Sequence, residues 1–179
     1  MRSRPLCIAF SAFVLLVALG ANGCALSRTV LDDSVVDRFA DPEQELDFWD
    51  ELATRPVVTN NDALHALLLM TEEEVASPSY ESRVAEAVRR GWMSDARRPP
   101  EHASATVGMI AMAACDLIDA RGGVTMLVFG PSPRVCTKEL VFLELLPPRS
   151  ENQSLSGLEF IDLVNRLEVE QAETTAGAS

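Results

Sequence analysis

Two histidines and four cysteines are the side chains best suited to chemistry in this sequence of 179 residues. His65 stands in an apolar segment and His102 in a polar one, so we expect a structural role for the first and a solvated one for the second. No nucleophile elbow, zinc-protease motif, P-loop or dinucleotide-binding glycine pattern is present. We therefore predict no catalytic residues and no cofactor, with the two histidines far apart and unpaired. An enzyme would instead bring one of them beside carboxylates.

Cys115 and Cys136 leave two structural alternatives open. A disulfide between them would close a loop of about 22 residues and would stabilise the fold by roughly 3 kcal/mol in the chain-entropy model. Two buried free thiols that pack as small apolar groups are the other possibility. The spacing does not fit zinc, which prefers paired cysteines or histidines.

Two further segments carry charge that could bind a partner. The acidic run at residues 72–74 has neither the alternating ligands nor the glycine of a calcium loop, so we predict a solvated cluster and no metal site. The segment GPSPR, residues 130–134, ends on Arg134 and suits the first turn of a helix. A sharper hypothesis is that Arg134 reaches a groove between repeats and contacts an anionic partner.

The overall charge restricts the classes of partner. With 15 Lys and Arg against 27 Asp and Glu, the formal net charge is −12. Such a surface repels phosphate backbones, so nucleic-acid binding is not expected.

The N-terminus has the layout of an export signal. Arg2 and Arg4 precede an apolar run, residues 6–19, that is shorter than the roughly 20 residues needed to cross a bilayer. The run closes on Ala21-Asn22-Gly23-Cys24, which resembles the lipobox of bacterial lipoproteins. The resemblance implies a signal peptide over residues 1–23, a lipidated Cys24 and a cell-envelope location, with Ala25 favouring the outer membrane if there are two. A plain secretory signal is the alternative.

The remaining pattern predicts a mainly α protein. Residues 24–40 show no clean period and are expected to form a flexible tether, and residues 169–179 a disordered tail. Between them, hydroxyl or carboxyl caps precede apolar-periodic segments. Helices are expected over residues 41–53, from Thr59, from Ser79 to Gly91, over 105–120, from Ser132 to about 146, and from Ser156. The segment 124–129 fits a strand or a short helix equally well.

Three of these segments form an internal repeat. VTNNDALHAL, ATVGMIAMAA and LSGLEFIDLV each have a hydroxyl cap, at Thr59, Thr106 and Ser156, followed by an apolar helix. The helices before the second and third copies also align, as EAVRRGWM and ELVFLELL. The unit is therefore a helix, a loop and a capped helix, at a period typical of repeat proteins.

This unit resembles the S-layer homology (SLH) domain. Leu155, Ser156, Glu159 and Phe160 match the opening of that family's second helix. The resemblance implies three repeats in a pseudo-threefold bundle over residues 41–168, with cell-wall polysaccharide bound in grooves between repeats, and it makes Ser156 and Glu159 candidate binding residues. Asn60, Val107 and Gly157 stand where the family has arginine. We expect a membrane-anchored, non-catalytic module that binds a glycan or another envelope protein; an accessory subunit or an envelope enzyme is the alternative.

Overall fold

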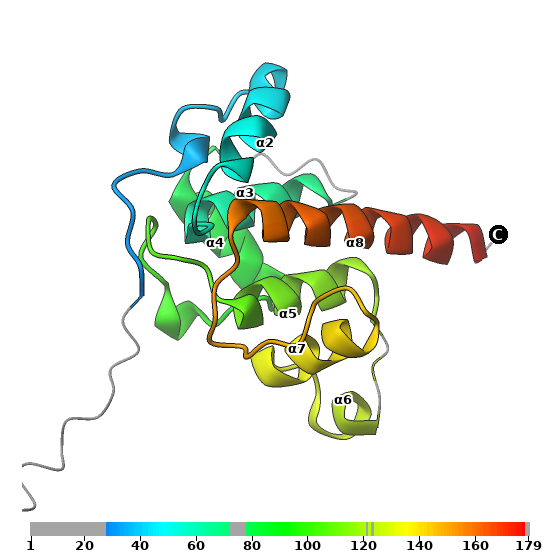
Figure 1. Ribbon diagram of the computed structural model, residues 1–179. Coiled ribbons are helices and arrows are strands. Elements are labelled where there is room, and N and C mark those ends of the chain that lie inside the picture. The colour runs from blue at the N-terminus through cyan, green and yellow to red at the C-terminus, as the bar shows by residue number, and fades with distance from the viewer. Residues whose placement is uncertain (1–27, 72–77, 121, 123, 178–179) are drawn as a thin grey trace, which may run out of the picture.

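A computed structural model describes residues 28–71, 78–120, 122 and 124–177, and this part of the chain is mainly helical, as predicted (Figure 1). Its seven α-helices and three short 3-10 helices follow in the order η1 (Val35–Asp37), η2 (Pro42–Gln44), α2 (Glu45–Ala53), α3 (Asn60–Leu69), α4 (Tyr80–Arg89), η3 (Asp95–Arg97), α5 (Val107–Leu117), α6 (Val124–Phe129), α7 (Pro133–Phe142) and α8 (Gly157–Gly177). β-type pairing in these residues is limited to two isolated bridges, Val30 with Ala103 and Thr59 with Ser104.

Side-chain caps set most helix starts. Thr59, Ser79, Thr106 and Ser132 each accept a hydrogen bond from the third backbone amide of the helix that follows. Such a cap satisfies an amide that has no partner inside the helix, which fixes where the helix begins. These four caps are the ones predicted from the sequence.

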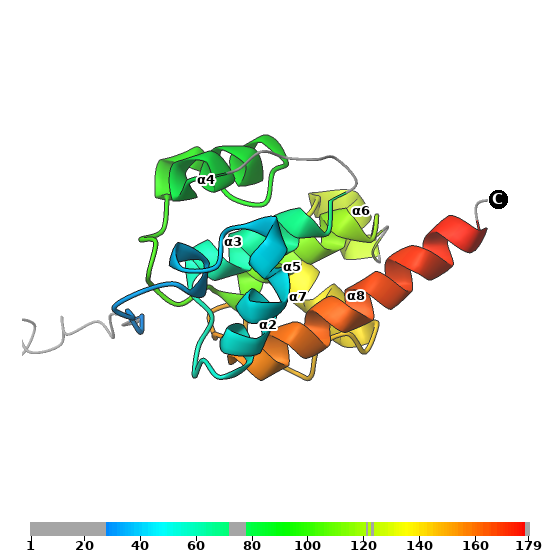
Figure 2. The ribbon, with the colours of Figure 1, turned by 90° about the horizontal axis from the view of Figure 1, so that it is seen from above.

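Helix α5 lies at the centre of the domain, as its nearly uniform apolar pattern predicted. Eight of its residues are buried, including Val107, Ile110 and Ala114. It packs against α3, α7 and α8. Figure 2, seen from above, shows α5 between α3 and α7.

The helix pairs follow a cyclic order. Helix α4 packs on α3, α7 packs on α5, and α2 packs on α8. The first backbone amide of each of the helices α3, α5 and α8 donates a hydrogen bond to the loop that precedes another of these three helices. Asn60 N donates to Ala103 O, before α5, at 2.9 Å, and Val107 N donates to Gln153 O, before α8, at 2.8 Å. Gly157 N donates to Arg55 O, before α3, at 2.9 Å. Each capped helix is thus tied to a different neighbouring loop, and the third bond closes the ring.

Residues 124–129 form helix α6, which is one of the two alternatives that the sequence left open. Two other helices end at a different place from the one expected. Helix α7 ends at Phe142 instead of reaching 146, because Glu144 turns to φ 60° and the amides of Leu145 and Leu146 fold back onto Leu140 O. Helix α8 continues to Gly177, so residues 169–177 are helical and not a disordered tail. In both views this end of α8 projects beyond the other helices (Figures 1 and 2).

The third difference from the sequence expectation is the tether over residues 24–40. Residues 24–27 lie outside the described part, but the segment from residue 28 onwards is built into the domain. Ser34, Val35 and Val36 are at most 1% exposed. The Ser34 hydroxyl bonds to Thr59 at 2.8 Å, and Val36 N donates to the buried carboxylate of Asp62 at 3.0 Å. Because these bonds join residues far apart in the sequence, no local hydrophobic periodicity predicted them.

Candidate functional site

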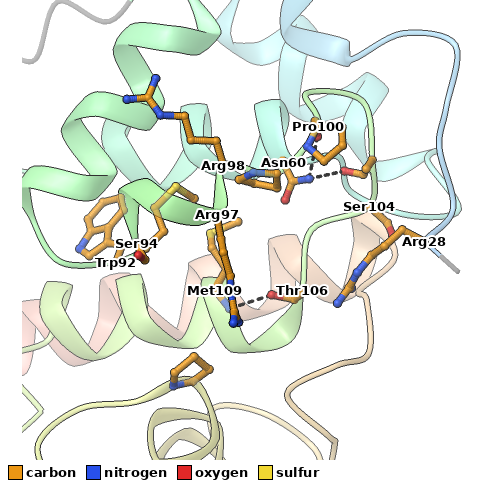
Figure 3. Close-up of a pocket in the computed structure, with 14 residues that line it drawn as sticks. Arg28, Asn60, Trp92, Ser94, Arg97, Arg98, Pro100, Ser104, Thr106 and Met109 are labelled. Atoms are coloured by element: carbon orange, nitrogen blue, oxygen red, sulfur yellow. Dashed lines mark hydrogen bonds between the residues drawn. The ribbon is translucent and has the colours of Figure 1, made fainter. Parts of the chain in front are cut away.

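A groove of about 570 Å³ opens where the starts of α3 and α5 meet the segment after α4 (Figure 3). Its lining includes three arginines, Arg28, Arg97 and Arg98, together with Asn60, Trp92 and Thr106. None of the residues that line it is an aspartate, glutamate or histidine. In a chain of net charge −12, this is a local concentration of positive charge.

Arg28 reaches the groove because its segment pairs with a distant one. Ser104 N donates to Thr29 O at 2.7 Å, and Leu31 N donates to His102 O at 3.0 Å. This short antiparallel contact holds residues 28–31 along the groove's edge. The Arg28 guanidinium makes one long contact, to Asn152 O at 3.4 Å, and retains donors for a ligand.

The opposite edge is held by Trp92. Gly91, at φ 77°, turns the chain after α4, and Trp92 N donates to Ala87 O at 2.9 Å. The indole is 2% exposed, and its N–H donates to Asp116 on α5 at 2.8 Å. Trp92 therefore ties this edge of the groove to both α4 and α5.

The three positions at which the SLH domain has arginine, occupied here by Asn60, Val107 and Gly157, are enclosed by the fold. Asn60 is 3% exposed, and its amide donates to Pro100 O and Ala103 O. Val107 is fully buried. At Gly157 a Cβ would lie 1.7 Å from Leu52 O. None of these three residues is cationic, so the groove's cations come from other segments.

The three groove arginines differ in how free they are. Arg98 pairs with Asp95 across one turn of η3. Arg97 is exposed, and among the described residues no carboxylate pairs with its guanidinium. Figure 3 shows Arg97 extending toward Thr106 and Met109, whereas Arg98 points the other way. A planar guanidinium with open donors binds carboxylate or phosphate oxygens in a two-pronged fashion, so Arg97 and Arg28 are the groups suited to an anionic ligand.

Arg134 lines a different pocket, and its contact with an anionic partner remains a prediction. It is exposed at the start of α7, beside a second pocket of about 540 Å³ between α6 and α7 that Met126, Lys138 and Phe142 also line. It does not line the groove between α3 and α5.

Ser156 and Glu159 form a reciprocal cap at the start of α8. Ser156 N donates to the Glu159 carboxylate at 2.9 Å, and Glu159 N donates to the Ser156 hydroxyl at 3.4 Å. The first of these bonds lowers the pKa of Glu159, and an ion pair with Arg149 adds to the effect. Both side chains therefore have a structural role, and a binding role remains a prediction.

Cys115 and Cys136 face each other from α5 and α7 as free, buried thiols, which is one of the two alternatives that the sequence left open. Cys24 lies outside the described residues.

The two histidines fall in different environments. His65 packs edge-on against Phe48, with ring centres 4.9 Å apart, and burial lowers its pKa to about 4. His102 was expected to be unpaired, but its Nε2 lies 3.1 Å from an oxygen of Asp37. Glu101 joins this group, and the three ligand atoms lie within 4.8 Å of one another. The Asn61 amide already bridges the two carboxylates, donating to Asp37 at 3.1 Å and to Glu101 at 2.8 Å.

Sequence reasoning missed Arg28 and Arg97. The available signal was the pair Arg97-Arg98 in the loop SDARRPPEHAS, one of two adjacent arginine pairs in this acidic chain. Arg28 gave no signal, because its place depends on pairing with residues more than 70 positions away.

Within the described residues, no helix is long and apolar enough to cross a membrane. Comparison of the chain with family models, with curated proteins and with solved structures gave no match.

Proposed function

We propose that the chain is a bacterial envelope lipoprotein, anchored through Cys24, whose helical domain binds an anionic cell-wall glycan without catalysing a reaction. The observation that carries this proposal is the groove: Arg28, Arg97 and Arg98 line it, no carboxylate does, and the rest of the chain is strongly acidic. A second envelope protein with an acidic surface would be the other partner of this kind.

The cyclic packing supports an SLH-like arrangement of three repeats. In each proposed repeat the first helix packs on the capped helix of another repeat: α4 on α3, α7 on α5, and α2 on α8. The groove lies between the capped helices of the first two repeats, where that family binds its glycan. Because the family's arginine positions are enclosed here, the proposed site is remade with cations from outside the motif.

The test is binding to purified cell-wall sacculi. We expect the chain to sediment with protein-free sacculi, and Arg97→Ala and Arg28→Ala each to weaken binding about tenfold, because each removes a charge-assisted contact. Arg166→Ala is the matched control, since this exposed arginine lies on α8 and pairs with Asp162. Added salt should weaken the wild type more than the variants.

Each outcome is informative. Binding only to sacculi that retain their proteins would point to a protein partner. Equal binding by Arg97→Ala, Arg28→Ala and the control would exclude the groove as the site.

The second candidate is an envelope enzyme or its accessory subunit, and the Asp37–His102 contact favours it. A histidine oriented by a carboxylate can act as a base when a nucleophile lies beside it. We favour the binding module because the groove has the cationic lining of a binding site and no histidine or carboxylate of its own.

A further inference from the structure

Three sulfur atoms meet inside the domain, between α5 and α7. Met112 and Cys115 are one turn apart on α5, and Cys136 faces them from α7. The Cys136 sulfur lies 3.5 Å from the Met112 sulfur. The Cys115 thiol lies beside Cys136 as well, where it donates to the Cys136 backbone carbonyl at 4.0 Å.

The two helices hold this group closely. A Cβ added at Gly108 on α5 would lie 2.8 Å from the Cβ of Pro133 on α7, so the glycine allows the helix starts to approach. Cys136 is fully buried, Cys115 is 4% exposed, and Met112 is half-buried. Met112 therefore forms the side of the cluster nearest the solvent.

We propose that Met112, Cys115 and Cys136 form a binding site for one monovalent copper ion, Cu(I). Thiolate and thioether sulfurs are the soft donors that this ion prefers. At metal–sulfur distances of about 2.3 Å, three donors around one metal stand roughly 4 Å apart, so the Cys136 and Met112 sulfurs, 3.5 Å apart, need only a small separation to bind one ion.

Other metals fit this donor set less well. A structural zinc site takes four nitrogen, oxygen or thiolate ligands, and a thioether is not among them. An iron–sulfur cluster needs four cysteine thiolates or their histidine replacements. Among the described residues, the cluster of histidine and carboxylates that could hold a metal is Asp37, Glu101 and His102, and it contains no cysteine.

Binding is a ligand exchange without oxidation or reduction. Each thiol that becomes a thiolate ligand releases one proton, and copper stays Cu(I). No metal-site spacing of cysteines or histidines marks this site in the sequence, because its third donor is a thioether.

The experiment is anaerobic titration of the reduced whole chain with a Cu(I)–acetonitrile complex, in competition with bicinchoninate. We expect one copper per chain and an X-ray absorption spectrum with sulfur neighbours only. Loss of an outer-shell partner typically costs 10–100-fold in affinity, so Cys136→Ser, which removes a ligand, should weaken binding by about 100-fold or more.

Two further variants keep the test decisive if Cys136→Ser folds poorly. Met112→Leu conserves core volume and should still weaken binding about tenfold. Met70→Leu, at the end of α3 and partly buried, should leave it unchanged. The proposal fails if the reduced chain takes no copper from bicinchoninate, or if Cys136→Ser and Met112→Leu bind as tightly as Met70→Leu.

Discussion

His65 shows how one half-buried side chain makes stability depend on pH. Burial, together with the positive charge of Arg83, lowers its pKa from 6.5 to about 4. The folded chain therefore keeps this ring neutral at a pH where the unfolded chain would protonate it. Because the folded pKa is depressed, the stabilisation is present above pH 6.5 and is lost as pH falls toward 4.

We expect this ring alone to cost about 2 kcal/mol of unfolding free energy between pH 7.5 and pH 5, by linkage from the shifted pKa. Urea denaturation of the wild type and of His65→Phe at both pH values measures it. Phenylalanine keeps the contact with Phe48 but does not titrate, so the variant should lose less stability than the wild type on acidification. Equal losses would mean that the ring protonates freely in the folded state.

Two groove residues show that the hydrogen-bond partners of a polar side chain decide its role. Arg97 and Asn60 are both polar, but Asn60 uses its amide on two backbone carbonyls, whereas Arg97 remains exposed. Residue type alone does not separate a structural polar group from one available to a ligand. The two kinds of polar group differ in whether the fold supplies hydrogen-bond partners for the side chain.

At the scale of elements, the contact between α2 and α8 closes the ring of helices. Gly157, the first residue of α8, donates its amide to Arg55 O and lies against the α2 backbone. Only a residue without a side chain fits there, because a Cβ would lie 1.7 Å from Leu52 O.

Gly157→Ala should therefore separate α2 from α8 and lower the unfolding free energy by about 3 kcal/mol or more, at the upper end for overpacking. The alternative view, in which alanine stabilises a helix relative to glycine, predicts a gain of up to about 1 kcal/mol. Thermal and urea unfolding distinguish the two signs. Asn165→Ala, at an exposed position of the same helix, should change stability by less than about 0.5 kcal/mol.

The helices were predictable where their cause is local. A hydroxyl before an apolar period is visible in the sequence, so Thr59, Ser79, Thr106 and Ser132 marked the starts of four helices. The end of α7 was not visible, because it depends on a positive φ at Glu144, a residue type with no strong preference for that conformation.

The candidate site was less predictable than the helices. It combines Arg97 and Thr106 with Arg28, whose segment joins them through backbone pairing of Thr29 and Leu31 with residues 102–104. Residues 28–37 looked like a tether because their burial follows no helical or strand period. Long-range contacts of this kind produce no hydrophobic periodicity in the local sequence.

At the scale of the whole molecule, the groove and the proposed anchor lie close together along the chain. Arg28 lines the groove, and only four peptide links separate it from Cys24. Four extended residues span at most about 14 Å. If Cys24 carries lipid, the groove opens at the membrane surface, and its ligand must be a part of the wall that comes within that distance.

This geometry makes the anchor testable on its own. Cys24→Ser should abolish palmitate labelling and move the chain from the membrane fraction to the soluble fraction, since acylation is then the only attachment and several chains are needed for stable anchoring. Sacculus binding by the released chain should be unchanged, because Cys24 is not part of the groove. A variant that still labels with palmitate would mean that the lipid is attached elsewhere. A variant that loses both membrane attachment and sacculus binding would mean that the groove depends on the anchor, for example through the placement of Arg28.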